Sequence, residues 1–112
     1  MMNKKVLYKG CLEPILLKLL HENGRMYGYD ITRKVKEITA GELNITEGAL
    51  YPLLHRLEAD GVLEAEMENI GNRVRKYYSL TQNGRKEKVK AVSELENFAQ
   101  TLQLLLNPKP SF

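Results

Sequence analysis

The stretch NITEGALYPLLHRLEADG, residues 44–61, decides the fold of this chain. Four of its leucines recur at the spacing of a helix: Leu50, Leu53, Leu54 and Leu57. An apolar stripe with that period predicts an amphipathic helix, with Thr46 as its N-cap and Gly61 as its stop.

The face opposite that stripe is unusual for a solvent surface. It is formed by Gly48, Pro52, His55 and Ala59, with Tyr51 and Arg56 on its flanks. A glycine and a proline inside a helix both lower its stability, and this face carries little charge. We therefore expect the outer face of this helix to contact a partner.

Two further helices are predicted before this stretch. Residues 8–22 have a wide apolar stripe, with Pro14 near the start of the regular part. In residues 27–38, apolar side chains recur at helical spacing along one face, and the last of them is Ile38. Because Cys11 is the only cysteine and lies in the first stripe, we expect a buried thiol and no disulfide within the chain.

After residue 61 the apolar period changes to two. Residues 62–68 alternate apolar side chains with three glutamates, which predicts a strand with one wet face. Residues 69–72 form a turn, and residues 73–80 are β-branched and aromatic and return as a second strand. Because Tyr78 shares a strand face with Leu80, we expect Tyr78 rather than Tyr77 to lie in the core.

A long helix capped by Thr81 follows the hairpin. Apolar residues recur in it at alternating spacings of three and four, which is a heptad seam: Val92, Leu95, Ala99, Leu102 and Leu106. Phe98 and Leu105 widen this seam. The order of elements predicts a mainly α fold with a two-stranded β-hairpin, which is the architecture of a winged helix-turn-helix followed by one long C-terminal helix.

Composition and charge limit the class of protein. With 112 residues, 43% of them hydrophobic, the chain suffices for one domain with a modest core. No apolar run is long enough to span a membrane, and the N-terminus lacks a secretory cleavage site, so we expect a cytoplasmic protein. The net charge of +3 favours an acidic partner, and the positive charge is concentrated between residues 73 and 90.

Three motifs carry a resemblance to a known family: YGYDI (27–31), ITEGALYPLLHRLEADGVL (45–63) and RKYYSLTQNGR (75–85). Together they resemble the PadR family of bacterial transcriptional regulators, over nearly the whole chain, and the single C-terminal helix is similar to the smaller subclass. The resemblance implies a dimeric, sequence-specific DNA-binding repressor, and for some members relief by a small aromatic effector. It implies a DNA-binding domain over residues 1–80, a dimerisation helix over 81–106 and a flexible tail over 107–112.

The resemblance and the chemistry of the side chains indicate which residues meet DNA. A small residue at Gly48 would let the helix enter the major groove, which is about 12 Å wide. The Tyr51 hydroxyl suits a phosphate oxygen, and Arg73 at the hairpin tip suits a narrow minor groove. The expected DNA-binding residues are Thr46, Glu47, Gly48, Tyr51, His55, Asn72, Arg73, Arg75, Lys76 and Tyr77.

Each of these residues also has a plainer interpretation. Tyr51 could cover the rim of the core, His55 could be an ordinary surface histidine, and the basic hairpin could be a solvated edge that blocks strand pairing. Tyr27 and Tyr29 of the YGYDI motif are interpreted as helix-packing residues.

The heptad seam predicts a homodimer, because a domain this small offers little surface to cover it. The expected interface residues are Leu12, Leu16, Val92, Leu95, Phe98, Ala99, Leu102, Leu105 and Leu106. Packing of the seam on the first helix of the same chain is the alternative.

Catalysis is not expected. The sequence contains no phosphate-binding glycine loop and no Ser/His/Asp set, and His21, His55 and Cys11 lack a metal-ligand spacing. We therefore expect no cofactor and no metal. The competing function is a winged helix that serves as a protein-interaction module without DNA binding.

Overall fold

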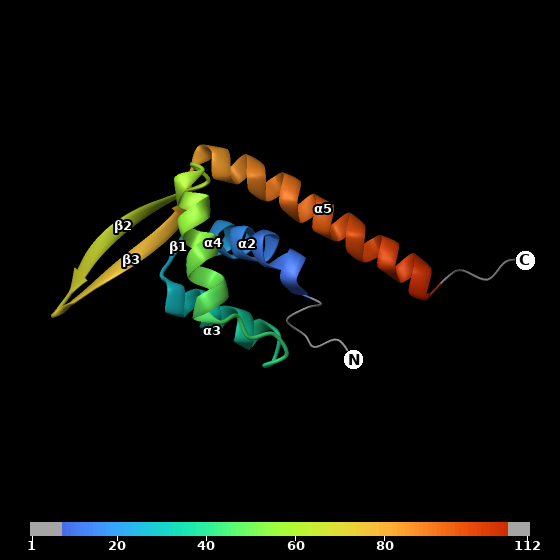
Figure 1. Cartoon of the computed structure of the whole chain (residues 1–112), viewed down its shortest axis with the longest axis horizontal. Coiled ribbons are helices and arrows are strands. Elements are labelled where there is room, and N and C mark those ends of the chain that lie inside the picture. The colour runs from blue at the N-terminus through green and yellow to red at the C-terminus, as the bar shows by residue number, and fades with distance from the viewer. Residues whose placement is uncertain (1–7, 108–112) are drawn as a thin grey trace, which may run out of the picture.

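The computed structural model describes residues 8–107. The elements follow one another in this order: a 3-10 turn η1 (Lys9–Cys11), α2 (Leu12–Asn23), β1 (Arg25–Met26), α3 (Gly28–Ile38), α4 (Glu47–Ala59), β2 (Leu63–Ile70), β3 (Arg73–Leu80) and α5 (Gln82–Leu106). Figure 1 shows α2, α3 and α4 gathered into one body, from which the β2–β3 hairpin projects on one side. The helix α5 begins beside the base of the hairpin, runs along α2 and extends beyond the opposite side of this body. The expected flexible tail lies outside the described residues, apart from Asn107.

The sheet has three strands in the order β1-β3-β2, and all pairs are antiparallel. The hairpin was predicted, but β1 was not, because a two-residue strand is too short to display an alternation. Met26 of β1 is buried opposite Tyr78, so this short edge strand contributes a side chain to the core.

One apolar core joins the helices to the base of the hairpin. It is built from leucines of α2 and α4, from Ile31 and Val35 of α3, and from Tyr78 and Leu80 of β3. Tyr78 is buried as predicted, whereas Tyr77 on the opposite face is only half-buried. Ile38, which ends the apolar face predicted for residues 27–38, is exposed at the end of α3. The expectation of a buried thiol is wrong, because Cys11 is only half-buried.

Local signals explain the bounds of α4. The Thr46 side chain accepts a hydrogen bond from the Ala49 amide at 3.2 Å, which satisfies one of the free amides of the first turn. After Ala59 the chain turns through Gly61, whose φ of +75° is the left-handed conformation that glycine adopts without strain. Three leucines of α4, at 50, 54 and 57, are buried as the stripe predicted.

The first turn of α5 fits tightly against the loop that precedes β2. Thr81 caps the helix by accepting from the Gly84 amide at 2.9 Å. Gly84 is buried, and a Cβ at this position would overlap the carbonyl oxygen of Val62, which is backbone and cannot move aside easily. From there α5 packs along α2.

We therefore predict that Gly84→Ala lowers the free energy of unfolding by about 1–3 kcal/mol, as overpacking does elsewhere. Denaturant titration would measure it. Gly48→Ala is the matched control, because Gly48 is also helical and a Cβ there meets no atom within 4 Å. It should raise stability by up to about 1 kcal/mol through helix propensity. Equal stability in both variants would contradict the tight fit.

Candidate nucleic-acid interface

The outer face of α4 is open to solvent along its whole length. Thr46, Glu47, Gly48, Pro52 and His55 are all exposed. This is the face that the sequence marked as small and weakly charged. The first amides of the helix have no preceding helical carbonyl to bond, so the N-terminal end of this face can donate to an anion.

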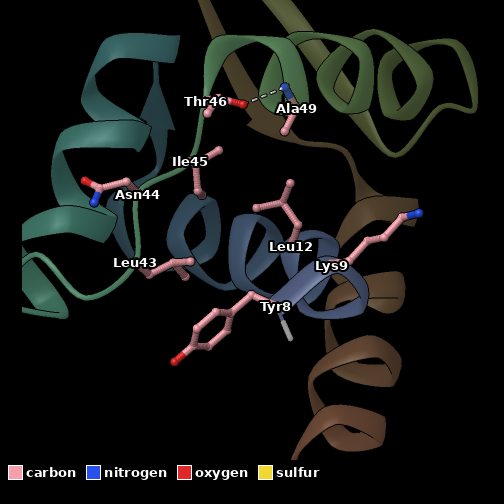
Figure 2. Close-up of a pocket in the computed structure, with 8 residues that line it drawn as sticks. All are labelled: Tyr8, Lys9, Leu12, Leu43, Asn44, Ile45, Thr46 and Ala49. Carbon is pink, nitrogen blue, oxygen red and sulfur yellow. Dashed lines mark hydrogen bonds between the residues drawn. The ribbon is translucent and has the colours of Figure 1, made fainter. Parts of the chain in front are cut away.

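Beside this end of α4 lies a shallow apolar groove of about 170 Å³. Figure 2 shows Leu12, Leu43 and Ile45 turned toward it, while the polar ends of Tyr8 and Lys9 point away. The groove reaches the cap formed by Thr46 and Ala49, shown as a dashed line in Figure 2. Its lining has no polar side chain directed inward, so it is no part of an anion-binding surface.

The side chain of Tyr51 extends from α4 to Gly28, the first residue of α3. Its hydroxyl and ring edge sit where a Cβ of Gly28 would be, so a glycine is needed at Gly28 for this approach. Its ring centroid is 6.4 Å from that of His55, and the residue is 37% exposed. The Tyr51 hydroxyl forms no hydrogen bond within residues 8–107, so it remains available to an outside acceptor.

The hairpin tip carries two of the expected residues on its surface. Gly71, with a φ of +62°, makes the turn, and Asn72 and Arg73 beside it are exposed. Arg73 has no carboxylate partner among the residues that the structure describes. The tip therefore presents one unshielded guanidinium to its surroundings.

Lys76 of β3 lies against α4, away from the hairpin tip. Its Nζ donates to Glu58 Oε1 of α4 at 2.9 Å and lies 5.2 Å from the centre of the Tyr78 ring. The hydrogen bond to Glu58 raises the pKa of the Lys76 ammonium above its ordinary value. In the free protein Lys76 thus ties the hairpin to α4 instead of presenting its charge at the tip.

Arg75 and Tyr77 belong to an aromatic cluster on the other face of the sheet. Tyr77 meets Tyr27 edge to face at 5.4 Å, and the Arg75 guanidinium lies 4.5 Å from the Tyr27 ring. A hydrogen bond with the Tyr77 side chain raises the pKa of Arg75. The Arg25 guanidinium lies over the Tyr77 ring, 4.3 Å from its centroid. Tyr27 therefore packs as expected, but against the hairpin as well as its own helix.

The expected dimer residues divide into three groups. Leu16 is 0% exposed within one chain, so it has no surface to lose to a partner, and its assignment to the interface was wrong. Leu16 lies on the side of α2 that faces the core. Leu12, Val92 and Leu95 are half-buried where α5 runs along α2.

The distal half of α5 is the third group. Within the described residues nothing covers it, and Phe98, Leu102, Leu105 and Leu106 are 56%, 40%, 73% and 76% exposed. Ala99 is exposed as well. Leu95 and Phe98 also border a cavity of about 390 Å³ between α5 and the start of α2, in which Phe98 is the one aromatic side chain.

Comparison with known proteins gives a consistent result. A model of the PadR-like transcriptional regulator family matches residues 16–90. Transcriptional regulator Rv3488 of Mycobacterium tuberculosis is 33% identical over 88 residues, which cover 77% of this chain and 79% of that protein. No helix among residues 8–107 is long and apolar enough to cross a membrane, and no group of potential metal ligands occurs in that part.

Two solved structures show the same fold. A PadR-like transcription factor of Bacteroides fragilis has a TM-score of 0.72 at 34% identity, over 91% of this chain and 96% of that one. PadR of Bacillus subtilis in complex with operator DNA has a TM-score of 0.64 at 28% identity, over 71% of this chain and 44% of that one. The predicted fold class is confirmed, with β1 as an added third strand.

The free hydroxyl of Tyr51 generates a prediction. Tyr51→Phe deletes only the oxygen, so if the hydroxyl donates to a DNA phosphate, the affinity should fall by about 1 kcal/mol. The loss should be equal on operator and random duplexes, because phosphates carry no sequence information. Fluorescence anisotropy at fixed salt would measure both. A lower melting temperature with unchanged affinity would make Tyr51 a core residue.

Proposed function

Because the chain belongs to the PadR-like family of transcriptional regulators, we propose that it is a homodimeric repressor that binds operator DNA through α4 and the hairpin. Members of this family are transcriptional regulators rather than enzymes, as predicted from the sequence. The single observation that carries the proposal is the exposed outer face of α4, which is small at its N-terminal end and weakly charged.

In this proposal the contacts divide into two kinds. Gly48 lets the start of α4 approach the floor of the major groove, and Glu47 and His55 are positioned on the same exposed face to reach base edges. Thr46, Tyr51, Asn72 and Arg73 contact the sugar-phosphate backbone and fix the register without contributing sequence information. Lys76, Arg75 and Tyr77 act by fixing the hairpin relative to α3 and α4.

The proposal includes a symmetric dimer through the distal half of α5. Leaving several large apolar side chains in water is unfavourable, and burial regains about 25 cal/mol for each Å² removed from water. A twofold axis would present two α4 helices to two half-sites about 34 Å apart on one face of DNA. We do not extend the proposal to a small aromatic effector, because the cavity beside α5 offers the single ring of Phe98.

The alternative is a winged helix that binds protein instead of DNA. The two functions differ in their response to salt, because DNA binding releases condensed counterions and weakens steeply as salt rises. Selection of bound sequences from a random pool of duplexes with the purified full chain tests the proposal directly. Enrichment of a palindromic pair of half-sites supports it, and recovery of unselected sequences contradicts it.

Arg73 at the hairpin tip should account for part of the salt dependence. Arg73→Ala should reduce the slope of log affinity against log salt by about 0.9, because one phosphate contact is lost. Lys90→Ala is the control, since Lys90 is also exposed but lies on α5, which runs away from the hairpin (Figure 1). If both variants keep the wild-type slope, the tip does not contact phosphate.

The dimer is tested by two leucines that lie close together on α5. Leu102 belongs to the heptad seam and is 40% exposed, whereas Leu104 is 61% exposed and points away from the seam. We expect Leu102→Glu to give monomers in sedimentation velocity, because a carboxylate would be buried without a partner. Leu104→Glu should leave the dimer intact. Dimers in both variants would exclude the seam from the interface.

A further inference from the structure

The hairpin that approaches DNA in the proposed function is not basic as a whole. Its strands contain three glutamates, Glu64, Glu66 and Glu68, and three cations, Arg73, Arg75 and Lys76. Acidic side chains near phosphates oppose binding, and their effect extends over roughly 10 Å at moderate salt. The glutamates of β2 are therefore a liability unless other groups neutralise them.

The cations of the hairpin itself do not neutralise Glu66 and Glu68. Lys76 is engaged by Glu58 of α4. Arg75 stands opposite Glu68 in the strand register, yet its guanidinium is turned to the Tyr27 ring and it forms no ion pair within the described residues. Arg73 lies at the tip, opposite Ile70.

A residue from outside the hairpin neutralises Glu66 and Glu68. Arg25 of β1 stands beside Ser79 of β3, and its side chain crosses β3 to reach β2. Its Nη1 lies 3.5 Å from Glu66 Oε2, and its Nη2 donates to Glu68 Oε2. The same guanidinium stacks on the Tyr77 ring. One side chain from the N-terminal part of the chain thus pairs with two of the three acids.

We propose that Arg25 is a positioning residue for DNA binding, which neutralises Glu66 and Glu68 so that the acidic strand of the hairpin can lie near the phosphate backbone. The inference rests on the proposed function and deepens it. Arg25 contacts no DNA in this scheme and acts through the two glutamates. Because the ion pairs of Arg25 with Glu66 and Glu68 are partly exposed, they contribute little to folding stability. Their effect is instead on the charge of the proposed binding surface.

Four forms of the full chain separate this role from a merely structural one. They are the wild type, Arg25→Gln, Glu66→Gln with Glu68→Gln, and the triple variant. Affinity for operator and random duplexes is measured by fluorescence anisotropy at low and at moderate salt. Arg25→Gln should bind both duplexes roughly threefold to tenfold more weakly at low salt, because two uncovered carboxylates repel the backbone.

The glutamine variants supply the decisive comparison. The triple variant should regain wild-type affinity, because Glu66 and Glu68 no longer carry the charges that Arg25→Gln leaves without a partner. In the wild-type background the same two changes should leave binding equal or slightly tighter. A triple variant that binds as weakly as Arg25→Gln would overturn the proposal, since the stacking on Tyr77 would then be what matters.

Two further variants guard the interpretation. Arg25→Lys keeps the charge and should bind within about twofold of the wild type, so a loss equal to that of Arg25→Gln overturns the charge argument. Arg33→Gln removes an arginine that pairs with Asp30 and Glu37 inside α3, without touching the hairpin. An equal loss in Arg33→Gln would also overturn it. Wild-type protein that binds no duplex refutes the proposed function itself, whereas a wild type that binds as tightly as Arg25→Gln refutes only the inference.

Discussion

The junction between Val62 and Thr81 fixes the relative positions of α4, the hairpin and α5. Thr81 donates its amide to the Val62 carbonyl at 3.1 Å, and its hydroxyl donates to the Gly61 carbonyl at 2.6 Å. These contacts join the loop after α4, the base of the hairpin and the start of α5, which meet at one point in Figure 1. At Gly84 the backbone of α5 also approaches the Val62 carbonyl closely. A shift at this point would move the hairpin and the proposed dimer helix together with respect to α4.

Side-chain bridges then fix the hairpin laterally. Lys76 ties one face to α4, while Arg25 and Arg75 tie the other to β1 and to Tyr27 at the start of α3. Most of the hairpin cations are used in this way, so its net charge toward a partner is small. In the proposed function, attraction to DNA then depends on a few uncommitted groups, chiefly Arg73, and on the neutralisation of opposing charge. This explains why the modest excess of positive charge in the sequence is compatible with a DNA-binding surface.

Periodicity predicted the helices and the hairpin because their apolar residues face one core, as in the leucines of α4 and in Tyr78. Contacts between residues far apart in the chain left no such trace. Arg25 lies 41 residues before Glu66, and Lys76 lies 18 residues after Glu58, so no local pattern predicted either pair. Leu16 was misassigned because a wide stripe contains both core and outer positions, and only the packing of α2 separates them. The signal that could have indicated Arg25 is the row of three glutamates in β2, a strand that contains no cation of its own.

Pro52 illustrates how α4 combines stability with an open face. It lacks an amide, so the hydrogen bond to the carbonyl of Gly48 is missing, and its ring crowds that carbonyl. Both residues lie on the exposed face of the first turns, where solvent or a bound partner can satisfy the free carbonyl. Inside a helix, Gly and Pro each lower stability relative to alanine, by about 1 and 3 kcal/mol. Here the buried leucines on the opposite face and the Thr46 cap keep the helix formed. Local rules are broken on the side that the core does not use, as is common at functional surfaces, and this supports contact as the role of that face.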